Sequence, residues 1–203
     1  MKLISPNWVY QHRTSKRFET INRFVLHIKN KQMKTLYIVR HAKSAWDQAG
    51  LADSERPLLE KGKKRTKWII DYLLEKNIKV DLIISSHAVR ALETARILGS
   101  ALHYPVDEIQ ISTNIYHADI DSFFNLFYNL SDDVESFMIV GHNPTITTFA
   151  NYFLDEKIEW LSTSGVVCVE FNTNKWDNVM DSEKTIKFVI TPKLMKERRK
   201  QKK

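Results

Sequence analysis

Short apolar runs alternate with longer amphipathic segments along most of this 203-residue chain. The apolar runs are rich in β-branched residues, as buried strands are, and they lie at 35–39, 80–86, the start of 136–144, 166–171 and 185–190. Apolar residues recur at helical spacing in segments 58–77, 88–102, 121–130 and 145–154. This alternation predicts an α/β fold of three layers, with a mostly parallel central sheet and helices on both faces. Asp121 or Ser122 is a suitable N-cap for the third helix.

Polar residues follow three of these predicted strands. They are Arg40-His41, then Ser85-Ser86-His87 with Arg90, and finally Gly141-His142-Asn143. In sheets of this kind, ligands bind beyond the carboxyl ends of the strands. We therefore expect these side chains to meet at one crevice, although they are far apart in the sequence.

Two histidines and two or three arginines around one crevice favour a phosphoryl ligand. Arginine forks hydrogen-bond the oxygens of a dianionic tetrahedral group, and a neutral histidine can attack phosphorus. A zinc site would place imidazoles or carboxylates around the metal without crowding arginines, and a serine hydrolase would need a G-x-S-x-G motif, which the sequence lacks. We therefore expect no metal and no cofactor.

Positive charge lies at the two ends of the chain. Seven Lys/Arg and one Glu occur in residues 1–32, and the same numbers occur in 193–203, so the net charge of +7 leaves residues 33–192 at −5. An acidic body with basic ends argues against nucleic-acid binding by the domain, and clustered like charge at an end is usually a solvated tail. We predict a basic N-terminal extension (1–32), a catalytic domain (33–192) and a basic C-terminal tail (193–203).

The N-terminal extension has three interpretations. It is upstream sequence that precedes a natural start at Met33, a basic amphipathic arm that docks on the domain, or an organelle-targeting peptide. We favour an accessory segment outside the catalytic core. The chain has no apolar run of membrane-spanning length and a single cysteine, Cys168, whose setting in "GVVCVEF" indicates strand packing. These features predict a cytoplasmic monomer that does not bind membranes.

Four blocks of sequence carry a family resemblance. "LYIVRHAKS", "ERPLLEKG", "DLIISSHAVRALETA" and "MIVGHNP" occur in the order seen in the histidine phosphatase superfamily. The chain most resembles the short SixA-type phosphohistidine phosphatases of that superfamily, including "STSGVVCVEF" before a late strand. The resemblance spans roughly residues 34–190 and implies a phosphoglycerate mutase-like fold.

The resemblance implies a role for each residue of the crevice. His41 would be the nucleophile that becomes phosphohistidine, while Arg40 and Arg90 would clamp the phosphoryl oxygens. His142 would donate a further hydrogen bond to them. Read without the resemblance, Arg90 is an ordinary solvated helix residue and His142 simply precedes a helix.

Three further residues are expected to bind substrate. Arg56, in "ERPL", matches an arginine near the site of SixA-type proteins, although an ion pair with Glu55 or Asp53 is an alternative. Ser44 and Asn143 lie close enough in sequence to His41 and His142 to assist the pocket.

The proton donor is not fixed by the sequence. The resemblance places His117 where related short proteins often have glutamate, and Asp119 is a second candidate. A phosphoramidate leaves through nitrogen and needs less help from an acid than an alkoxide does. The short body also lacks the long insertions that enclose small substrates in mutase-type relatives.

The sequence therefore predicts a metal-independent phosphatase that acts through a phosphohistidine intermediate, with phosphorylated histidine on a protein as the favoured substrate. The alternatives are a phosphomonoesterase of small phosphorylated molecules and a phosphate-binding module without turnover. A nucleic-acid binder that uses the basic tail is a further alternative, which the acidic body argues against.

Overall fold

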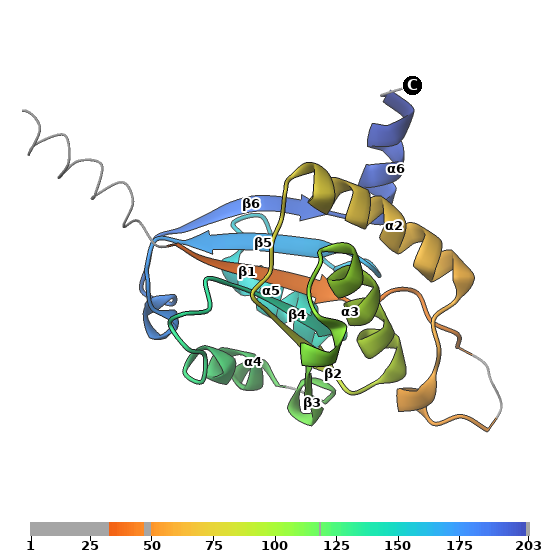
Figure 1. The fold of residues 1–203 in the computed structure, drawn as a ribbon, viewed down its shortest axis with the longest axis horizontal. Coiled ribbons are helices and arrows are strands. Elements are labelled where there is room, and N and C mark those ends of the chain that lie inside the picture. Colours follow the sequence, from red (N-terminus) through yellow and green to blue (C-terminus); the bar gives the residue numbers. More distant parts are fainter. Residues whose placement is uncertain (1–32, 47–49, 118, 202–203) are drawn as a thin grey trace, which may run out of the picture. The chain divides into compact units, whose positions relative to one another are not determined.

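The computed structural model describes residues 33–46, 50–117 and 119–201. The predicted extension at residues 1–32 lies outside the described residues. The described chain forms a central sheet with helices packed on both of its faces (Figure 1). This arrangement confirms the three-layer α/β fold. Among the described helices, none is both long and apolar enough to cross a lipid bilayer.

The described sheet has six strands in the order β3-β2-β4-β1-β5-β6. They are β1 (Lys34–Arg40), β2 (Leu82–Ser86), β3 (Gln110–Ser112), β4 (Ser136–Gly141), β5 (Val166–Phe171) and β6 (Lys184–Ile190). The β1–β4, β2–β4 and β2–β3 pairs are parallel, whereas β5 is antiparallel to both β1 and β6. The parallel half therefore holds β1, β2 and β4, whose carboxyl ends share one edge.

Helices α4 (Ile120–Phe127) and α5 (Thr145–Phe153) supply the core on one face of the sheet, and α2 (Glu60–Glu75), α3 (Val89–Ala101) and α6 (Pro192–Gln201) supply it on the other. The alternation of side chains along β1 explains this division. Leu36 and Ile38 belong to the first core, whereas Tyr37 and Val39 belong to the second. Both sets are buried, which is why the run reads as uninterrupted apolar sequence.

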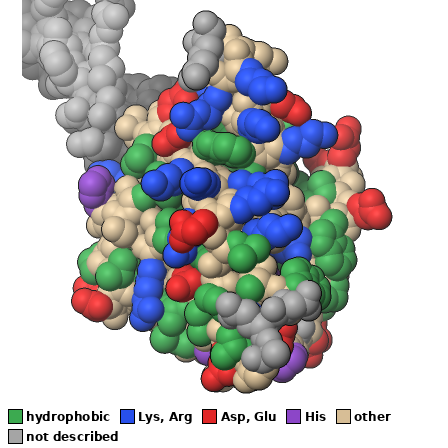
Figure 2. All heavy atoms as spheres, turned by 90° about the vertical axis from the view of Figure 1, so that its right-hand side faces the viewer, with side chains coloured by type: hydrophobic (Ala, Val, Ile, Leu, Met, Phe, Trp, Pro, Cys, Tyr) green, Lys and Arg blue, Asp and Glu red, His purple; other side chains and the backbone are tan. Residues whose placement is uncertain are grey.

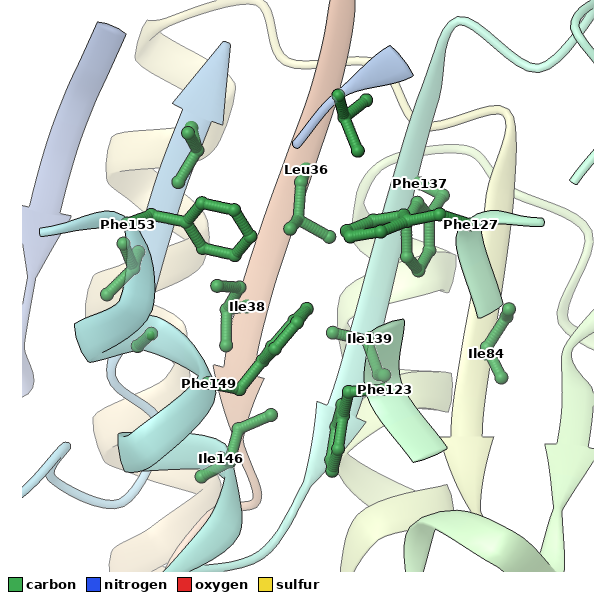
Figure 3. Close-up of a cluster of buried hydrophobic side chains, with 14 of the residues drawn as sticks. Leu36, Ile38, Ile84, Phe123, Phe127, Phe137, Ile139, Ile146, Phe149 and Phe153 are labelled. Carbon is green, nitrogen blue, oxygen red and sulfur yellow. The ribbon is translucent and has the colours of Figure 1, made fainter. Parts of the chain in front are cut away.

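Aromatic rings fill the core beneath α4 and α5 (Figure 3). Phe123 and Phe127 from α4 meet Phe149 from α5 with ring centroids 4.9 and 6.1 Å from that ring. Trp176 stacks on Phe127 with the centroids 5.8 Å apart. Full burial of such a side chain stabilises a fold by roughly 1.5–3 kcal/mol, so this cluster anchors the strands that carry the crevice.

Two local predictions are corrected. The N-cap of α4 is Asp119, whose carboxylate accepts hydrogen bonds from the Ser122 backbone N–H (2.9 Å) and hydroxyl (2.6 Å), so neither Asp121 nor Ser122 is the cap. Strand β3 was absent from the sequence prediction because only three exposed or half-exposed residues form it.

The C-terminal segment is also more ordered than a solvated tail. Residues 192–201 form α6, which packs on α2 through buried Met195. Arg198 pairs with Glu75 at 2.7 Å, and Arg199 pairs with Asp71. The clustered charge that suggested a tail is partly matched by carboxylates on the outer face of α2.

Candidate active site

A cavity of about 520 Å³ opens where β1 and β4 end. The pairing of Arg40 with Gly141 in the parallel ladder places His41 and His142 side by side, with their ring centroids 5.0 Å apart. All seven residues predicted to catalyse the reaction or bind substrate line this cavity: Arg40, His41, Ser44, Arg56, Arg90, His142 and Asn143. The crevice predicted from three separate strand ends is therefore formed.

His41 is held in a defined tautomer. Its Nδ1–H donates a 2.7 Å hydrogen bond to the carbonyl oxygen of Ala42, which leaves the Nε2 lone pair available. Burial, together with the charges of Arg90 and Arg40, lowers the pKa of His41 to about 3 against the opposing effect of the Ala42 bond. At neutral pH the ring is uncharged, as a nucleophilic imidazole must be.

His142 is buried and neutral for a similar reason. Burial lowers its pKa to about 2, with a smaller contribution from His41. Its Nε2 lies 2.9 Å from the Ser86 hydroxyl, whose oxygen already accepts from the Ala88 N–H. Among the described residues Nε2 is the acceptor recorded for the Ser86 hydroxyl hydrogen, which favours donation from Ser86 to Nε2 and leaves the hydrogen of His142 on Nδ1, where it has no partner.

The two arginines predicted to clamp a phosphoryl group reach the cavity from different elements. Arg40 ends β1, donates to the Leu161 carbonyl at 2.8 Å and lies over the Trp160 ring at 5.6 Å. Burial lowers the pKa of Arg40, yet an arginine stays charged at any physiological pH. Arg90 is 5% exposed near the start of α3, so it is not the solvated helix residue of the alternative interpretation.

Asp53 joins three groups of the site. Its carboxylate pairs with Arg90 at 2.8 Å and with Arg56 at 3.2 Å, and it accepts a hydrogen bond from the Tyr116 hydroxyl. The Tyr116 hydrogen bond and these cations hold the pKa of Asp53 below its usual value. The ion pair predicted as the alternative for Arg56 is therefore present, and it lies within the cavity lining.

Ser44 and Asn143 have different surroundings. Ser44 is buried and pairs with Leu58 in an isolated antiparallel bridge. Asn143 donates to the Leu161 carbonyl at 3.1 Å and accepts from the Thr147 hydroxyl at 2.7 Å. These two bonds fix the loop that also receives the Arg40 guanidinium.

Neither candidate proton donor lines the cavity. His117 is exposed, and its ring lies against Tyr116 at 4.3 Å. Asp119 is occupied as the α4 cap, and its hydrogen bonds from Ser122 hold its pKa below the usual value. An ionised, hydrogen-bonded carboxylate is a poor acid, which counts against Asp119 as proton donor.

Several buried polar atoms of the site lack a partner among the described residues. Four of the six such side-chain atoms belong to the cavity lining: Nε of Arg40, Arg56 and Arg90, and Nδ1 of His142. All four are nitrogens of cations or of a neutral imidazole. Unsatisfied buried donors cost free energy, and their presence in one cavity lining suits an acceptor-rich ligand such as a phosphoryl group.

The loop behind His41 depends on two close contacts. The Ala42 N–H donates to the Thr94 hydroxyl of α3 at 2.9 Å. A Cβ at Gly62 would lie 2.3 Å from the Lys43 carbonyl oxygen, so a larger residue would push α2 away from this loop. Helices α2 and α3 thus hold the loop that follows His41 in place.

Sequence reasoning missed two polar residues of the site. The Tyr116 ring packs against the rings of His87, His117 and His142, and the Arg90 guanidinium lies over it, 5.7 Å from the ring centroid. Asp53 was considered only as a loop partner of Arg56. Both lie in polar connecting segments whose composition indicates only a turn. Their position between the four family-like blocks is the sequence feature that could have pointed to them.

Comparisons with known proteins agree with this geometry. Residues 36–112 match the model of the histidine phosphatase superfamily (branch 1). An uncharacterized protein of Mycobacterium leprae is 30% identical over 115 residues, which is 55% of this chain and 68% of that protein. The chain belongs to the histidine phosphatase superfamily. The matched region holds His41, Arg40, Arg56 and Arg90, whereas His142 lies beyond it.

Solved structures of the histidine phosphatase fold match a larger part of this chain than the family model does. A structure described as a candidate phosphohistidine phosphatase SixA from Agrobacterium tumefaciens is 26% identical with a TM-score of 0.64, covering 78% of this chain and 98% of that one. The protein histidine phosphatase SixA complexed with tungstate shares the fold at 20% identity and a TM-score of 0.67, covering 79% of this chain and 99% of that one. Phosphatases of small molecules also share the fold.

Metal-ligating side chains do not gather in the described part of the chain. No group of three or more His, Cys, Asp or Glu is placed there to hold a metal ion. Cys168 is buried in β5, and burial raises the pKa of its thiol to about 12, as expected for a packing residue.

Proposed function

We propose that this phosphatase removes the phosphoryl group from phosphohistidine on another protein, without a metal, through a covalent intermediate on His41. The observation that carries the proposal is the state of His41. It is neutral, oriented through Nδ1, and placed among unpartnered nitrogens of Arg40, Arg90 and His142.

The first step follows from that arrangement. Nε2 of His41 attacks phosphorus, the P–Nε2 bond forms, and the bond from phosphorus to the substrate's imidazole nitrogen breaks. The leaving nitrogen takes a proton from solvent. Arg40 and Arg90 hold the phosphoryl oxygens in line, and the Nδ1–H of His142 donates to one of them.

Water completes the reaction. It attacks phosphorus and gives one proton back to solvent, the P–Nε2 bond breaks, and inorganic phosphate leaves as His41 returns to its neutral form. The bond from His41 Nδ1 to the Ala42 carbonyl persists through both steps, because only Nε2 gains and loses the phosphoryl group.

The choice of a phosphoramidate rests on the missing acid. Among the described residues of the cavity lining, Asp53 is the one carboxylate, and its lowered pKa and bonds to arginines make it a poor proton donor. A leaving alkoxide would need a donor more than a leaving imidazole does. The likeness to SixA structures supports the same substrate class.

A substrate panel tests the proposal. The enzyme is assayed on a phosphohistidine protein, a small phosphoramidate and a sugar phosphate, each with and without a chelator. We expect kcat/KM to fall in that order, with no effect of the chelator. Preference for the sugar phosphate would support a small-molecule phosphomonoesterase, and loss of activity with chelator would contradict the metal-free mechanism.

A further inference from the structure

A second hollow adjoins the active-site cavity. It has a volume of about 720 Å³, and Arg65 and Thr163 line both. Its other lining residues come from α2, the loop before β5 and the start of α6: Lys61, Lys64, Trp68, Ser162, Pro192, Lys193 and Lys196. We call this hollow the basic groove.

The charge of the basic groove has one sign. Five of its nine lining residues are Lys or Arg, and none is Asp or Glu. Figure 2, which views the edge of the sheet where β1 ends, shows Lys and Arg side chains gathered across the middle of this face. An unneutralised cluster of this kind raises the local concentration of anionic partners.

The cations of α2 and α6 differ between the two ends of these helices in whether carboxylates pair with them. Away from the cavity, Arg198 and Arg199 of α6 pair with carboxylates of α2. Beside the cavity, none of the described carboxylates pairs with Lys64, Lys193 or another groove cation. Among the described residues, these cations are therefore left available to an acidic partner.

The form of the groove favours a protein segment over a small anion. Lys61, Lys64, Lys193 and Lys196 are exposed, so their ammonium groups are mobile and cannot form a fixed cage for one phosphate. The four span two helices, and Lys61 to Trp68 alone covers about 10 Å of α2 at the rise of an α-helix. Half-buried Trp68 supplies an apolar surface, which a peptide side chain can cover.

One polar atom of the groove is also unsatisfied. The Ser162 hydroxyl oxygen is buried and has no hydrogen-bond partner among the described residues. It lies in the loop between the two hollows, beside Thr163, which lines both. This loop therefore joins the groove to the cavity.

We propose that the basic groove binds an acidic segment next to the phosphohistidine of the partner protein, and that this contact selects the substrate. The inference rests on the proposed function for its site, but it adds a determinant that lies outside the catalytic cavity. The sequence had assigned the basic charge of 193–203 to a tail, whereas Lys193 and Lys196 stand on an ordered helix beside the cavity.

Two synthetic phosphohistidine peptides test the groove. One has Asp and Glu around the phosphohistidine and the other has Asn and Gln; a small phosphoramidate serves as the substrate without flanks. We expect kcat/KM to be about tenfold higher for the acidic peptide at low salt, because several surface charges act together, and the preference should shrink as salt rises.

The groove variant is Lys64→Glu with Lys193→Glu, and its matched control is Lys79→Glu with Lys184→Glu. All four lysines are exposed, and the control pair lies outside both hollows while changing the net charge equally. The groove variant should lose the tenfold preference and keep its phosphoramidate rate within about twofold, whereas the control should keep both. Lys64→Gln with Lys193→Gln gives a milder version if charge reversal lowers expression.

The outcomes separate the groove from the catalytic proposal. Equal kcat/KM for the two peptides in the wild type, or an equal loss in both variants, overturns the inference. If neither peptide is dephosphorylated, the proposed substrate is wrong, and the groove is then tested by binding of the unphosphorylated acidic peptide. Binding that only the groove variant loses supports the groove as a site for acidic segments, and absence of binding overturns it. Binding of anionic vesicles or single-stranded DNA with no preference between the peptides also overturns it.

Discussion

The active-site cavity and the basic groove are both cationic, but they hold their charge in different ways. The cavity uses arginines that are buried or half-buried and fixed by bonds, such as Arg40 to the Leu161 carbonyl and Arg90 to Asp53. The groove uses mostly exposed lysines without ion pairs to described carboxylates. Fixed forks suit a single tetrahedral group whose oxygens must be held in line.

Mobile ammonium groups suit a partner whose acidic residues vary in position. Their attraction is long-ranged and screened by salt, so it changes encounter and selection more than chemistry. Positive charge at this edge of the sheet is therefore presented in two ways, by fixed arginines in the cavity and by exposed lysines in the groove. Four experiments test how far that separation holds.

The largest effect is expected for the nucleophile. His41→Ala should lower kcat/KM on every substrate by at least about 10⁴-fold and abolish the trapped phosphoenzyme, because no other side chain replaces a covalent nucleophile. Rapid quench with a phosphorus-32 substrate measures both. Turnover near the wild-type rate would mean that the cavity does not perform the chemistry, and the comparison with the groove would fail.

Exchange of the two kinds of cation gives the next effect. Arg90→Lys keeps the charge but loses the fork, and should lower kcat/KM on a small phosphoramidate by about 10²-fold. Lys64→Arg with Lys193→Arg should change kcat/KM on the acidic peptide by less than about twofold. Equal tolerance at both places would show that the cavity, like the groove, needs only charge.

Acid should destabilise the folded protein through the two cavity histidines, because burial lowers the pKa of His41 and His142 to about 3 and about 2 in the folded state. The unfolded chain binds these protons below about pH 6.5, so stability present at neutral pH is lost as the pH falls toward the folded values. The free energy of unfolding should fall by up to about 4 kcal/mol between pH 7 and pH 5.

Urea denaturation at the two pH values measures this loss. His41→Gln with His142→Asn should lose markedly less stability between pH 7 and pH 5 than the wild type. His103→Asn, at an exposed histidine outside both hollows, is the matched control substitution. An unchanged slope in the double variant would mean that other groups govern acid unfolding. Activity itself should persist to about pH 5, since His41 stays neutral there.

The smallest effect is expected at the rim. His117→Ala should change kcat/KM on phosphoramidate and ester by less than about threefold, because His117 is exposed and lies outside the cavity lining, whereas a positioned acid contributes about 10²-fold or more. Paired pH–rate profiles on the two substrates measure this. A loss confined to the ester would restore His117 as the proton donor.

The sequence by itself determined the layers and the place of the predicted nucleophile, His41. The uninterrupted apolar run of β1 required two covered faces, and the order of strands and helices placed its end at a ligand crevice. Arg40 and His41 directly follow that run, so their position needs little more than the local pattern. The matched blocks then identified Arg90 and His142 as their partners.

Only the tertiary structure decided which side chains complete the site. The hydrogen bond from Tyr116 to Asp53 joins residues 63 apart in sequence, and the bond from Arg40 to Leu161 joins residues 121 apart. Such contacts depend on the paths of loops, whose composition records a turn but not its destination. The same holds for α6, whose charge suggested a solvated tail until the carboxylates of α2 were found beside Arg198 and Arg199. Periodic patterns in a chain predict elements because hydrogen bonding and burial act locally, whereas a partner for a charge is set by the fold as a whole.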